Sequence, residues 1–322
     1  MDSPQEYICT GLEHFSPRLN VFASFQKTSL SVDITEDHVF LGYKPLVIGI
    51  PVKKDSSCHE AFISSKEICL SFNTVGVFKQ SSVKYGFPVD KKSLARLTLK
   101  RIASREYGDT SSFIYEGVKG EHNFLSSFHQ FTNQLRDKLK KKKDGNVGLP
   151  GNLYEQVRIA YALPRIISII TVAKDGLCNM FPTDLHGSIN NEFYVGSLRH
   201  EGNACLQVEE TKKIVISHVS INCFRDAYAM GKNHMQDLKP IETFKIHAAQ
   251  SELFHYPLNK ETLSYRELEL VGSYDVGIHR LLFYKIMNSK ILNSNSDTLS
   301  HIHQYYEAWR KKQGIKTDSV LR

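Results

Sequence analysis

Three segments in the C-terminal half of the chain carry side chains that could bind a ligand or move a proton. The first, 174–184 (KDGLCNMFPTD), follows an apolar run and begins with a glycine turn. This order predicts a strand and a tight turn, with backbone amides, the Asn179 amide and the Thr183 hydroxyl at the rim of a sheet. Such a rim could bind a planar aromatic ring, whose face Met180 and Phe181 would cover. An ordinary hairpin is the alternative, which this segment alone favours.

The other two segments, 197–204 (SLRHEGNA) and 274–280 (YDVGIHR), each adjoin a predicted strand. In the first, Arg199 has hydroxyl, glycine and amide neighbours, a setting that suits a phosphate because a guanidinium forms paired hydrogen bonds. In the second, His279 opens an apolar strand and could carry or orient a proton near neutral pH. The alternatives are an exposed cation in a loop and a structural histidine.

The order of these segments resembles the flavin reductase-like family of FMN-binding split β-barrels, most clearly over 160–288. The stretch IISIITVAKDGLCNMFPTDLHG is similar to the family's opening strand, glycine turn and flavin loop. EFYVGSLRHEGNACLQVEETKKIVIS is similar to its strand, Arg loop and following strand, and LELVGSYDVGIHRLLFYKI to its Gly-Asp-His region. The family's Gly-Asp-His is spread here over 275–279, a departure that weakens the pyridine-nucleotide contact more than the flavin contact.

The resemblance implies a role for each matched residue. Those expected to line the isoalloxazine ring are Asn179, Met180, Phe181, Pro182 and Thr183. Ser197, Leu198 and Arg199 would face the ribityl chain or the phosphate, and Thr211 and Lys212 are weaker phosphate candidates. His279 would face the nicotinamide and is the single candidate catalytic residue.

The chain also resembles itself. Shifted by 147 positions (164 − 17), residues 17–72 align without a gap and share eight identities with the second copy, Pro17 on Pro164 and Gly49 on Gly196 among them. Self-similarity at a fixed offset indicates duplicated structural units. Under Asn179–Asp184 this alignment places Val32–Asp37, with two added carboxylates, and under Arg199 it places Val52. The first copy is therefore interpreted as a degenerate barrel kept for packing.

The elements that must position these residues are mostly strands. Short stretches rich in β-branched and aromatic residues, bounded by turn formers, predict strands in each copy. In the first copy they are 17–26, 38–51, 66–72, 94–103 and 112–118, and in the second 164–173, 192–199, 213–220, 266–272 and 280–287. Aromatic and leucine residues three to four apart predict an amphipathic helix over 122–143, and a second helix is expected over 298–312.

These elements predict a mainly β protein with peripheral helices, in which two tandem split β-barrels form an intrachain pseudo-dimer. The expected division is a first barrel with its helix over 1–144, a linker at 145–152 (GNVGLPGN), and a second barrel with its helix over 153–322. Duplication can supply the self-complementary surface of a two-fold interface within one chain. A homodimer of the whole chain is the alternative.

Composition limits the partners. The net charge of +7 is concentrated in the run 138–143 (KLKKKK) and near residue 311, without the motifs of a nucleic-acid binder, so nucleic-acid binding is not expected. No stretch reaches the length of a membrane span, and no secretory signal is seen, so we expect no membrane partner. The six cysteines lack CxxC spacing, which predicts no metal site and a reducing cytoplasm.

The expected function is that of an FMN-binding flavin reductase that transfers hydride from NAD(P)H to the flavin. The cofactor would do the redox chemistry and the protein would bind and orient it. A flavin carrier or sensor without turnover is one alternative, and an interaction protein that has lost the flavin is another.

Overall fold

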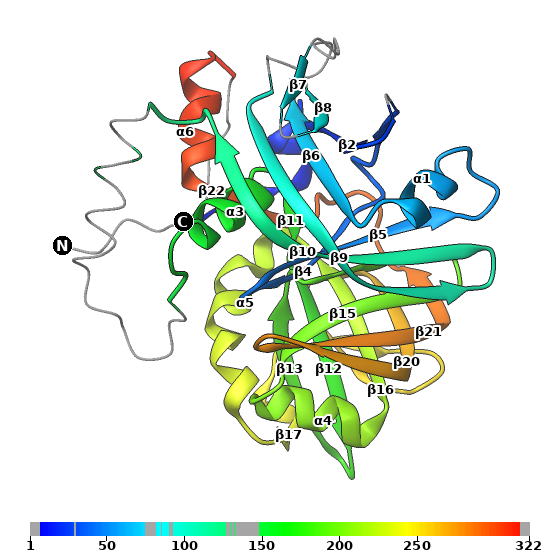
Figure 1. Cartoon of the computed structure of the whole chain (residues 1–322). Coiled ribbons are helices and arrows are strands. Elements are labelled where there is room, and N and C mark those ends of the chain that lie inside the picture. Colours follow the sequence, from blue (N-terminus) through cyan, green and yellow to red (C-terminus); the bar gives the residue numbers. More distant parts are fainter. Residues whose placement is uncertain are drawn as a thin grey trace.

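The computed structural model describes residues 7–28, 30–74, 82–84, 86–89, 93–126, 130, 132 and 148–315. This part of the chain is mainly β-strand, with a few helices. Two large antiparallel sheets lie against each other, and short helices cover their ends (Figure 1).

The first sheet has seven strands and curls around a core of its own. Its strand order is β3 (Ser31–Asp33), β2 (Asn20–Phe25), β6 (Glu67–Asn73), β9 (Ala95–Tyr107), β10 (Thr110–His122), β5 (Leu46–Lys53) and β4 (Val39–Tyr43). Inward side chains of six of these strands, such as Val21, Ile50 and Leu97, meet in one buried cluster. Helix α1 (His59–Ser64) follows β5.

The second sheet has eight strands around another core. Its order is β14 (His186–Ser188), β15 (Phe193–Arg199), β21 (His279–Ile291), β20 (Thr262–Val276), β16 (Lys213–Val219), β12 (Ser168–Lys174), β13 (Leu177–Thr183) and β17 (Lys239–Pro240). Helix α4 (Asn203–Thr211) follows β15 and packs Val208 into this core. Helix α5 (Phe224–Met230) follows β16 after the turn η2 (Ile221–Cys223), and the turns η3 (Gly231–Met235) and η4 (Ile241–Thr243) follow α5.

The remaining strands form smaller sheets. In a three-stranded sheet, β22 (Leu299–His303) pairs with β1 (Tyr7–Gly11) and β11 (Arg165–Ile166), and η1 (Leu12–Phe15) follows β1. Two further pairs join β18 (Ile246–Gln250) to β19 (Pro257–Asn259) and β7 (Ser82–Lys84) to β8 (Phe87–Val89). The two ends of the described chain therefore share one sheet.

Both large sheets have the same strand order. The second sheet has one additional strand, β17, at its end. Read backwards from β13, its order is β13-β12-β16-β20-β21-β15-β14, and each of these strands corresponds to the strand at the same place in the first sheet. The long hairpins also carry bulges at matching places: Ile102 and Val118 are the extra residues in the first, and Val271 and Met287 in the second, 169 positions later in both cases (271 − 102 and 287 − 118). Counting pairs outward from these bulges defines which residues of the two sheets are equivalent.

This register changes two of the sequence alignments. Val32 is equivalent to Phe181 and not to Asn179, because Val32 pairs with Ala23 and Phe181 with its equivalent, Ile170. His279 is equivalent to Thr110, because each comes two residues after the left-handed glycine of its hairpin, Gly277 or Gly108. Their strand partners are Arg199 and Lys53, so Arg199 is equivalent to Lys53 rather than to Val52. The ungapped offset of 147 fails here because the spacing between equivalent residues of the two sheets is one residue shorter in β5 and β15, at 146 (199 − 53).

The sheets meet through apolar side chains contributed by both. Val39, Val47 and Ile114 of the first sheet pack with Val195 and Phe283 of the second. Strands β4 and β14 touch at the centre, where a Cβ on Gly187 would lie 2.7 Å from Val39. This close approach requires a residue without a side chain.

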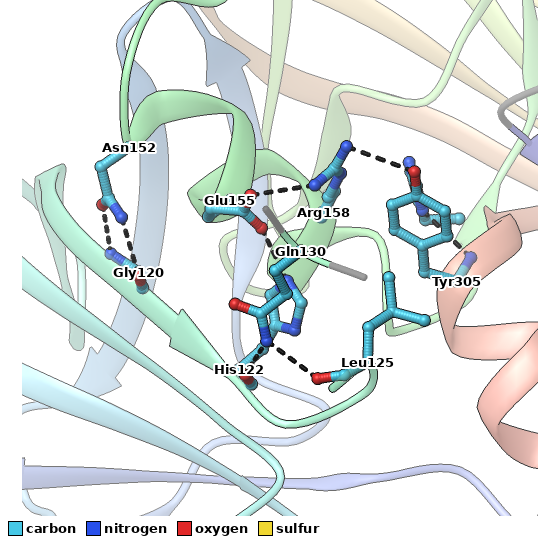
Figure 2. A network of polar contacts seen from close by, with 9 residues as sticks. Gly120, His122, Leu125, Gln130, Asn152, Glu155, Arg158 and Tyr305 are labelled. Carbon is cyan, nitrogen blue, oxygen red and sulfur yellow. Dashed lines mark hydrogen bonds and ion pairs between the residues drawn. The ribbon is translucent and has the colours of Figure 1, made fainter. Parts of the chain in front are cut away.

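Helices α3 (Leu153–Ala160) and α6 (Gln304–Lys312) close the first core. Figure 2 shows how α3 is held: the Asn152 amide bonds both backbone groups of Gly120, and Glu155 bonds His122 (2.6 Å) and Arg158 (2.9 Å). A Cβ on Gly120 would lie 3.0 Å from the Gln156 backbone, so the helix can lie directly on β10 only because this residue is a glycine.

Strand predictions from the sequence are confirmed, and the helix predictions are corrected in part. Each predicted strand overlaps a strand of the structure, although 38–51 is divided between β4 and β5 and 164–173 between β11 and β12. The helix predicted over 122–143 falls mostly outside the described residues, and His122 itself ends β10. The helix predicted from residue 298 is wrong at its start, because Leu299–His303 pairs with β1 and β11 and α6 begins only at Gln304.

Candidate functional site

Three of the predicted site residues meet where β15 pairs with β21. Arg199 lies opposite His279 in the strand register, and the Ser197 hydroxyl is 3.3 Å from His279 Nδ1. Alternation along β15 places Ser197 and Arg199 on one face of the strand, with Leu198 turned into the second core. The pairing of these two strands therefore brings together two residues 80 positions apart.

A loop of the first sheet covers this group. The backbone N–H of Tyr43 donates to His279 Nε2 (3.4 Å), and the two rings meet edge to face at 4.5 Å. The Tyr43 hydroxyl accepts a hydrogen bond from Arg199 Nε at 2.6 Å. The site therefore belongs to both sheets, and the sequence offered no local pattern that could have identified Tyr43.

His279 is neutral and fully engaged. Its side chain is 1% exposed, and burial, together with the nearby positive charge of Arg199, lowers its pKa to about 4. Since Nε2 accepts from Tyr43, the neutral ring carries its proton on Nδ1 and donates it to Ser197. No nitrogen of this ring is left to give a proton to a ligand in this arrangement.

Arg199 is the open group of the site. Its Nε is fixed by Tyr43, whereas among the described residues neither of its terminal amino groups has a recorded acceptor. The side chain is exposed, and its guanidinium lies 5.7 Å from the centre of the Tyr43 ring. An oriented guanidinium whose two terminal amino groups are free can bind a phosphate or carboxylate in a fork.

The segment predicted to line a planar ring is an interior strand, β13. Asn179 is 0% exposed, and its amide donates to Gln207 Oε1 (2.9 Å) and to the backbone oxygen of Asn233 (3.0 Å). Met180 and Phe181 are also 0% exposed, in two different apolar cores.

The end of β13 is only slightly more open. Pro182 is half-buried, and its backbone oxygen accepts from His234 Nε2 at 2.8 Å. The Thr183 hydroxyl accepts from the N–H of Leu185. His234, a residue that the sequence did not single out, thus takes the carbonyl that a ligand at this rim would contact first.

Thr211 and Lys212 lie apart from this group. They are at the C-terminal end of α4, which begins four residues after Arg199 and is about 13 Å long. The Thr211 hydroxyl donates to the backbone oxygen of Gln207 (2.9 Å), and Lys212 ends the helix in a left-handed conformation (φ 59°). The structure does not bring these two residues together with Arg199.

In the part of the chain that the structure describes, no group of three or more His, Cys, Asp or Glu side chains could hold a metal ion. In the same part of the chain no helix is long and apolar enough to cross a membrane.

The solved structures that resemble this chain include flavin reductases and an FMN-binding protein. One is an FMN-binding protein from Thermus thermophilus with bound p-hydroxybenzaldehyde, at 13% identity over 48% of this chain and 83% of that one (TM-score 0.39). Another is an NADH:FAD oxidoreductase from Streptomyces globisporus, at 11% identity over 50% and 95% (TM-score 0.40). A third is the flavin reductase component of a bacterial two-component tryptophan halogenase, at 15% identity over 47% and 94% (TM-score 0.42). No family model and no curated protein matches the chain.

Proposed function

We propose that this protein binds FMN at the seam between its two sheets, with the cofactor phosphate on Arg199. The observation that supports this most directly is the state of that guanidinium, which Tyr43 orients while its terminal amino groups stay open. The sequence resemblance assigns the phosphate side of the cofactor to the same residue. The phosphate end of FMN therefore fits the residues present.

The ring end fits less well. Asn179, Met180 and Phe181 are buried in packing and cannot cover an isoalloxazine with their side chains. Only the half-buried Pro182 and the strand end at Thr183, which is 8% exposed, remain to contact it from this strand. The ring would thus rest on the end of β13 rather than on its middle.

We further propose that the protein is a flavin oxidoreductase with NAD(P)H as reductant. When bound, FMN supplies the redox chemistry by accepting hydride. Arg199 would hold its phosphate and Tyr43 would fix the direction of Arg199. His279 would keep its Nδ1 proton in the hydrogen bond to Ser197 and support this wall, since its pKa of about 4 leaves it uncharged at neutral pH.

A flavin carrier or sensor without turnover is the second candidate, and the state of His279 favours it. A histidine that is 1% exposed and bonded at both nitrogens offers little to a nicotinamide. The two candidates differ in one observation: NADH or NADPH added without oxygen bleaches the bound flavin of a reductase and leaves that of a carrier yellow.

The binding proposal is tested by FMN titration of the wild type, Arg199→Ala and Arg225→Ala. Arg225 is an exposed arginine of α5 without a recorded partner among the described residues, so it controls for loss of one positive charge. We expect Arg199→Ala to weaken FMN binding about tenfold or more, as removal of a charge-assisted pair of hydrogen bonds does, and Arg225→Ala to leave it unchanged. Equal affinities in all three proteins would reject the phosphate assignment.

The equal strand order and the matching bulges support a further proposal, that the chain is a tandem duplication and works as a monomer with an internal pseudo-dimer. Its expected division is 1–144, 145–152 and 153–322. The described part of the last range includes β22, which pairs with β1 near the N-terminus. All six cysteines are free and buried, which agrees with a reducing compartment such as the cytoplasm.

A further inference from the structure

A cleft of about 380 Å³ opens between the two sheets. It is bounded by the connection from β3 to β4, the connection from β13 to β14, and the inner ends of β16 and β20. The residues of the proposed flavin site (Tyr43, Pro182, Thr183, Ser197, Arg199 and His279) do not line it, although Asp184, which follows Thr183, does. Its volume is within the range of small-molecule sites.

The cleft contains a cation without a counter-ion. Arg266 is half-buried with its guanidinium 5.5 Å from the centre of the Tyr194 ring, and within the described part of the chain it has no recorded hydrogen bond or ion pair. The carboxylates in the cleft have other partners: Asp184 accepts from His301 (2.7 Å) and Tyr161 (2.5 Å). The exposed Glu36 lies 3.8 Å from Arg18. Arg266 is thus available to an anion.

Two histidines of the cleft have a buried nitrogen without a partner. His38 Nδ1 donates to the backbone oxygen of Ile34 (2.9 Å), so in the neutral ring its buried Nε2 is an acceptor without a donor. His186 Nδ1 bonds the Tyr194 hydroxyl (2.7 Å), and its Nε2 is likewise buried and unpartnered among the described residues. Burial lowers the pKa of both rings to about 4, so both are neutral near pH 7. Buried polar atoms are normally satisfied, and a bound ligand is one way to satisfy them.

The equivalent place in the first sheet is filled with apolar side chains. Arg266 is equivalent to Leu97 and His218, which also lines the cleft, is equivalent to Phe72. Leu97 and Phe72 are 0% and 1% exposed inside the first core. The polar side chains are therefore particular to the second sheet, since the same strands can be packed with apolar ones.

The walls of the cleft suit a flat ligand. The rings of His186 and Tyr194 are stacked, with 6.0 Å between centres and 19° between planes, and His218 lies 6.3 Å from His186. Aromatic faces of this kind pack well against another planar group. A guanidinium beside them has the geometry for a carboxylate.

We propose that this cleft binds a small planar carboxylate, separately from the flavin. The carboxylate pairs with Arg266, and the planar body lies against Tyr194 and His186. A hydroxyl or amine on that body would donate to His38 Nε2. The proposal does not depend on flavin binding at Arg199.

Calorimetric titration with benzoate tests the proposal, with benzamide as the uncharged planar control and inorganic phosphate as the non-planar anion. The variants are Arg266→Leu, which installs the residue type of the first sheet, and Arg105→Leu, which removes an arginine that lies over the Phe283 ring outside the cleft. We expect benzoate to bind the wild type and Arg105→Leu equally and to bind Arg266→Leu about tenfold or more weakly. Benzamide and phosphate should bind much more weakly than benzoate, and FMN affinity should be unchanged in Arg266→Leu.

Several results would overturn the proposal. The proposal is wrong if benzoate has no measurable affinity for the wild type. It is also wrong if benzamide or phosphate binds as tightly as benzoate, or if Arg266→Leu binds benzoate as tightly as the wild type does. Loss of FMN binding in Arg266→Leu with retention in Arg199→Ala would make the cleft the flavin site instead. If Arg266→Leu does not fold, His218→Phe, which fills the cleft with the side chain of its first-sheet equivalent, must abolish benzoate binding.

Discussion

The two sheets share a strand order and a pair of bulges, yet one is closed and the other is open. Helices α3 and α6 cover the core of the first sheet, and Trp309 and Tyr306 of α6 pack into it. At positions where the first sheet buries Leu97 and Phe72, the second has Arg266 and His218 facing a cleft. The same strand arrangement thus encloses an apolar core in the first sheet and borders a polar cleft in the second. A few side chains at the inner ends of β16 and β20 account for this difference.

The closed state of the first sheet depends on Arg310, and its removal should give the largest effect. Arg310 is 0% exposed and donates to the backbone oxygens of Phe15 (2.7 Å), Pro17 (2.9 Å), Ser16 (3.1 Å) and His14 (3.4 Å). Arg310→Met keeps the volume but leaves these oxygens and the buried Glu307 carboxylate without the cation. We expect a loss of about 3–5 kcal/mol in the free energy of unfolding, measured by urea denaturation.

A matched control and a double variant complete this test. Arg225→Met removes an exposed arginine and should change stability by less than about 0.5 kcal/mol. Arg310→Met with Glu307→Gln should recover part of the loss, because the buried carboxylate, which otherwise keeps only the exposed Lys311 as a partner (3.7 Å), is then replaced by a neutral amide. A loss below about 1 kcal/mol in Arg310→Met would show that α6 does not depend on this residue.

The next largest effect should come from the contact between His301 of β22 and Asp184, which follows β13 of the second sheet (2.7 Å). Burial alone would lower the pKa of His301, but its hydrogen bond to Asp184 outweighs burial and raises it to about 9. A histidine with a raised pKa stabilises the fold fully below pH 6.5, and this contribution is lost as the pH rises towards 9. We expect about 1–3 kcal/mol of stability to disappear over that interval.

His301→Gln identifies the source of this pH dependence. The variant should be less stable than the wild type at pH 6.5 and should show a flatter profile between pH 6.5 and 9, measured by urea unfolding at each pH. Below pH 6.5 the pH dependence of stability reverses, and the fold becomes less stable as the pH falls. The reason is that burial lowers the pKa values of His186 and His218 to about 4 and 3, so these side chains bind protons more readily in the unfolded chain. A wild-type profile that stays level from pH 6.5 to 9 would contradict the assignment of charge to His301.

Much of the strand framework could be predicted from the sequence, since strand patterns are local. Alternating β-branched and aromatic runs identified most strands of both sheets, although not β3, β13, β14 or β17. The family resemblance assigned Arg199 and His279 to one site, and the strand register sets them opposite each other. Residues whose partners lie far along the chain could not be predicted in this way. Tyr43 reaches Arg199 across 156 positions, and β22 is a strand only because β1 and β11 flank it.

The cleft was missed for a related reason. Arg266 and His218 belong to different strands, and each looks like an ordinary polar residue in its own segment. Their replacement of Leu97 and Phe72 becomes visible only when the bulges fix which residues are equivalent. The ungapped offset of 147 could not show it, since the later strands of the two sheets correspond at an offset of 169.

A smaller effect would sharpen the comparison at the seam. Arg199 and its equivalent Lys53 are both exposed cations at the end of a strand, but only Arg199 has a tyrosine hydroxyl to orient it. We expect Arg199→Ala to weaken FMN binding about tenfold and Lys53→Ala to leave it unchanged, in fluorescence titrations of flavin. An equal loss of FMN affinity in both variants would indicate two flavin sites related by the pseudo-symmetry. The first sheet would then bind flavin as the second sheet does.

The smallest effect concerns Tyr115 and Tyr284, which are equivalent residues of the two cores. They are 0% and 1% exposed, and neither hydroxyl has a partner among the described residues. Burial raises the pKa of both, so both stay protonated, and each hydroxyl costs desolvation without a hydrogen bond in return. Tyr115→Phe and Tyr284→Phe should therefore each stabilise the fold by up to about 1 kcal/mol in urea unfolding. If Tyr284→Phe destabilises while Tyr115→Phe does not, the hydroxyl of the second core has a partner that the first lacks. The polar character of the second sheet would then extend from the cleft, through Tyr194 on the neighbouring strand, into the core itself.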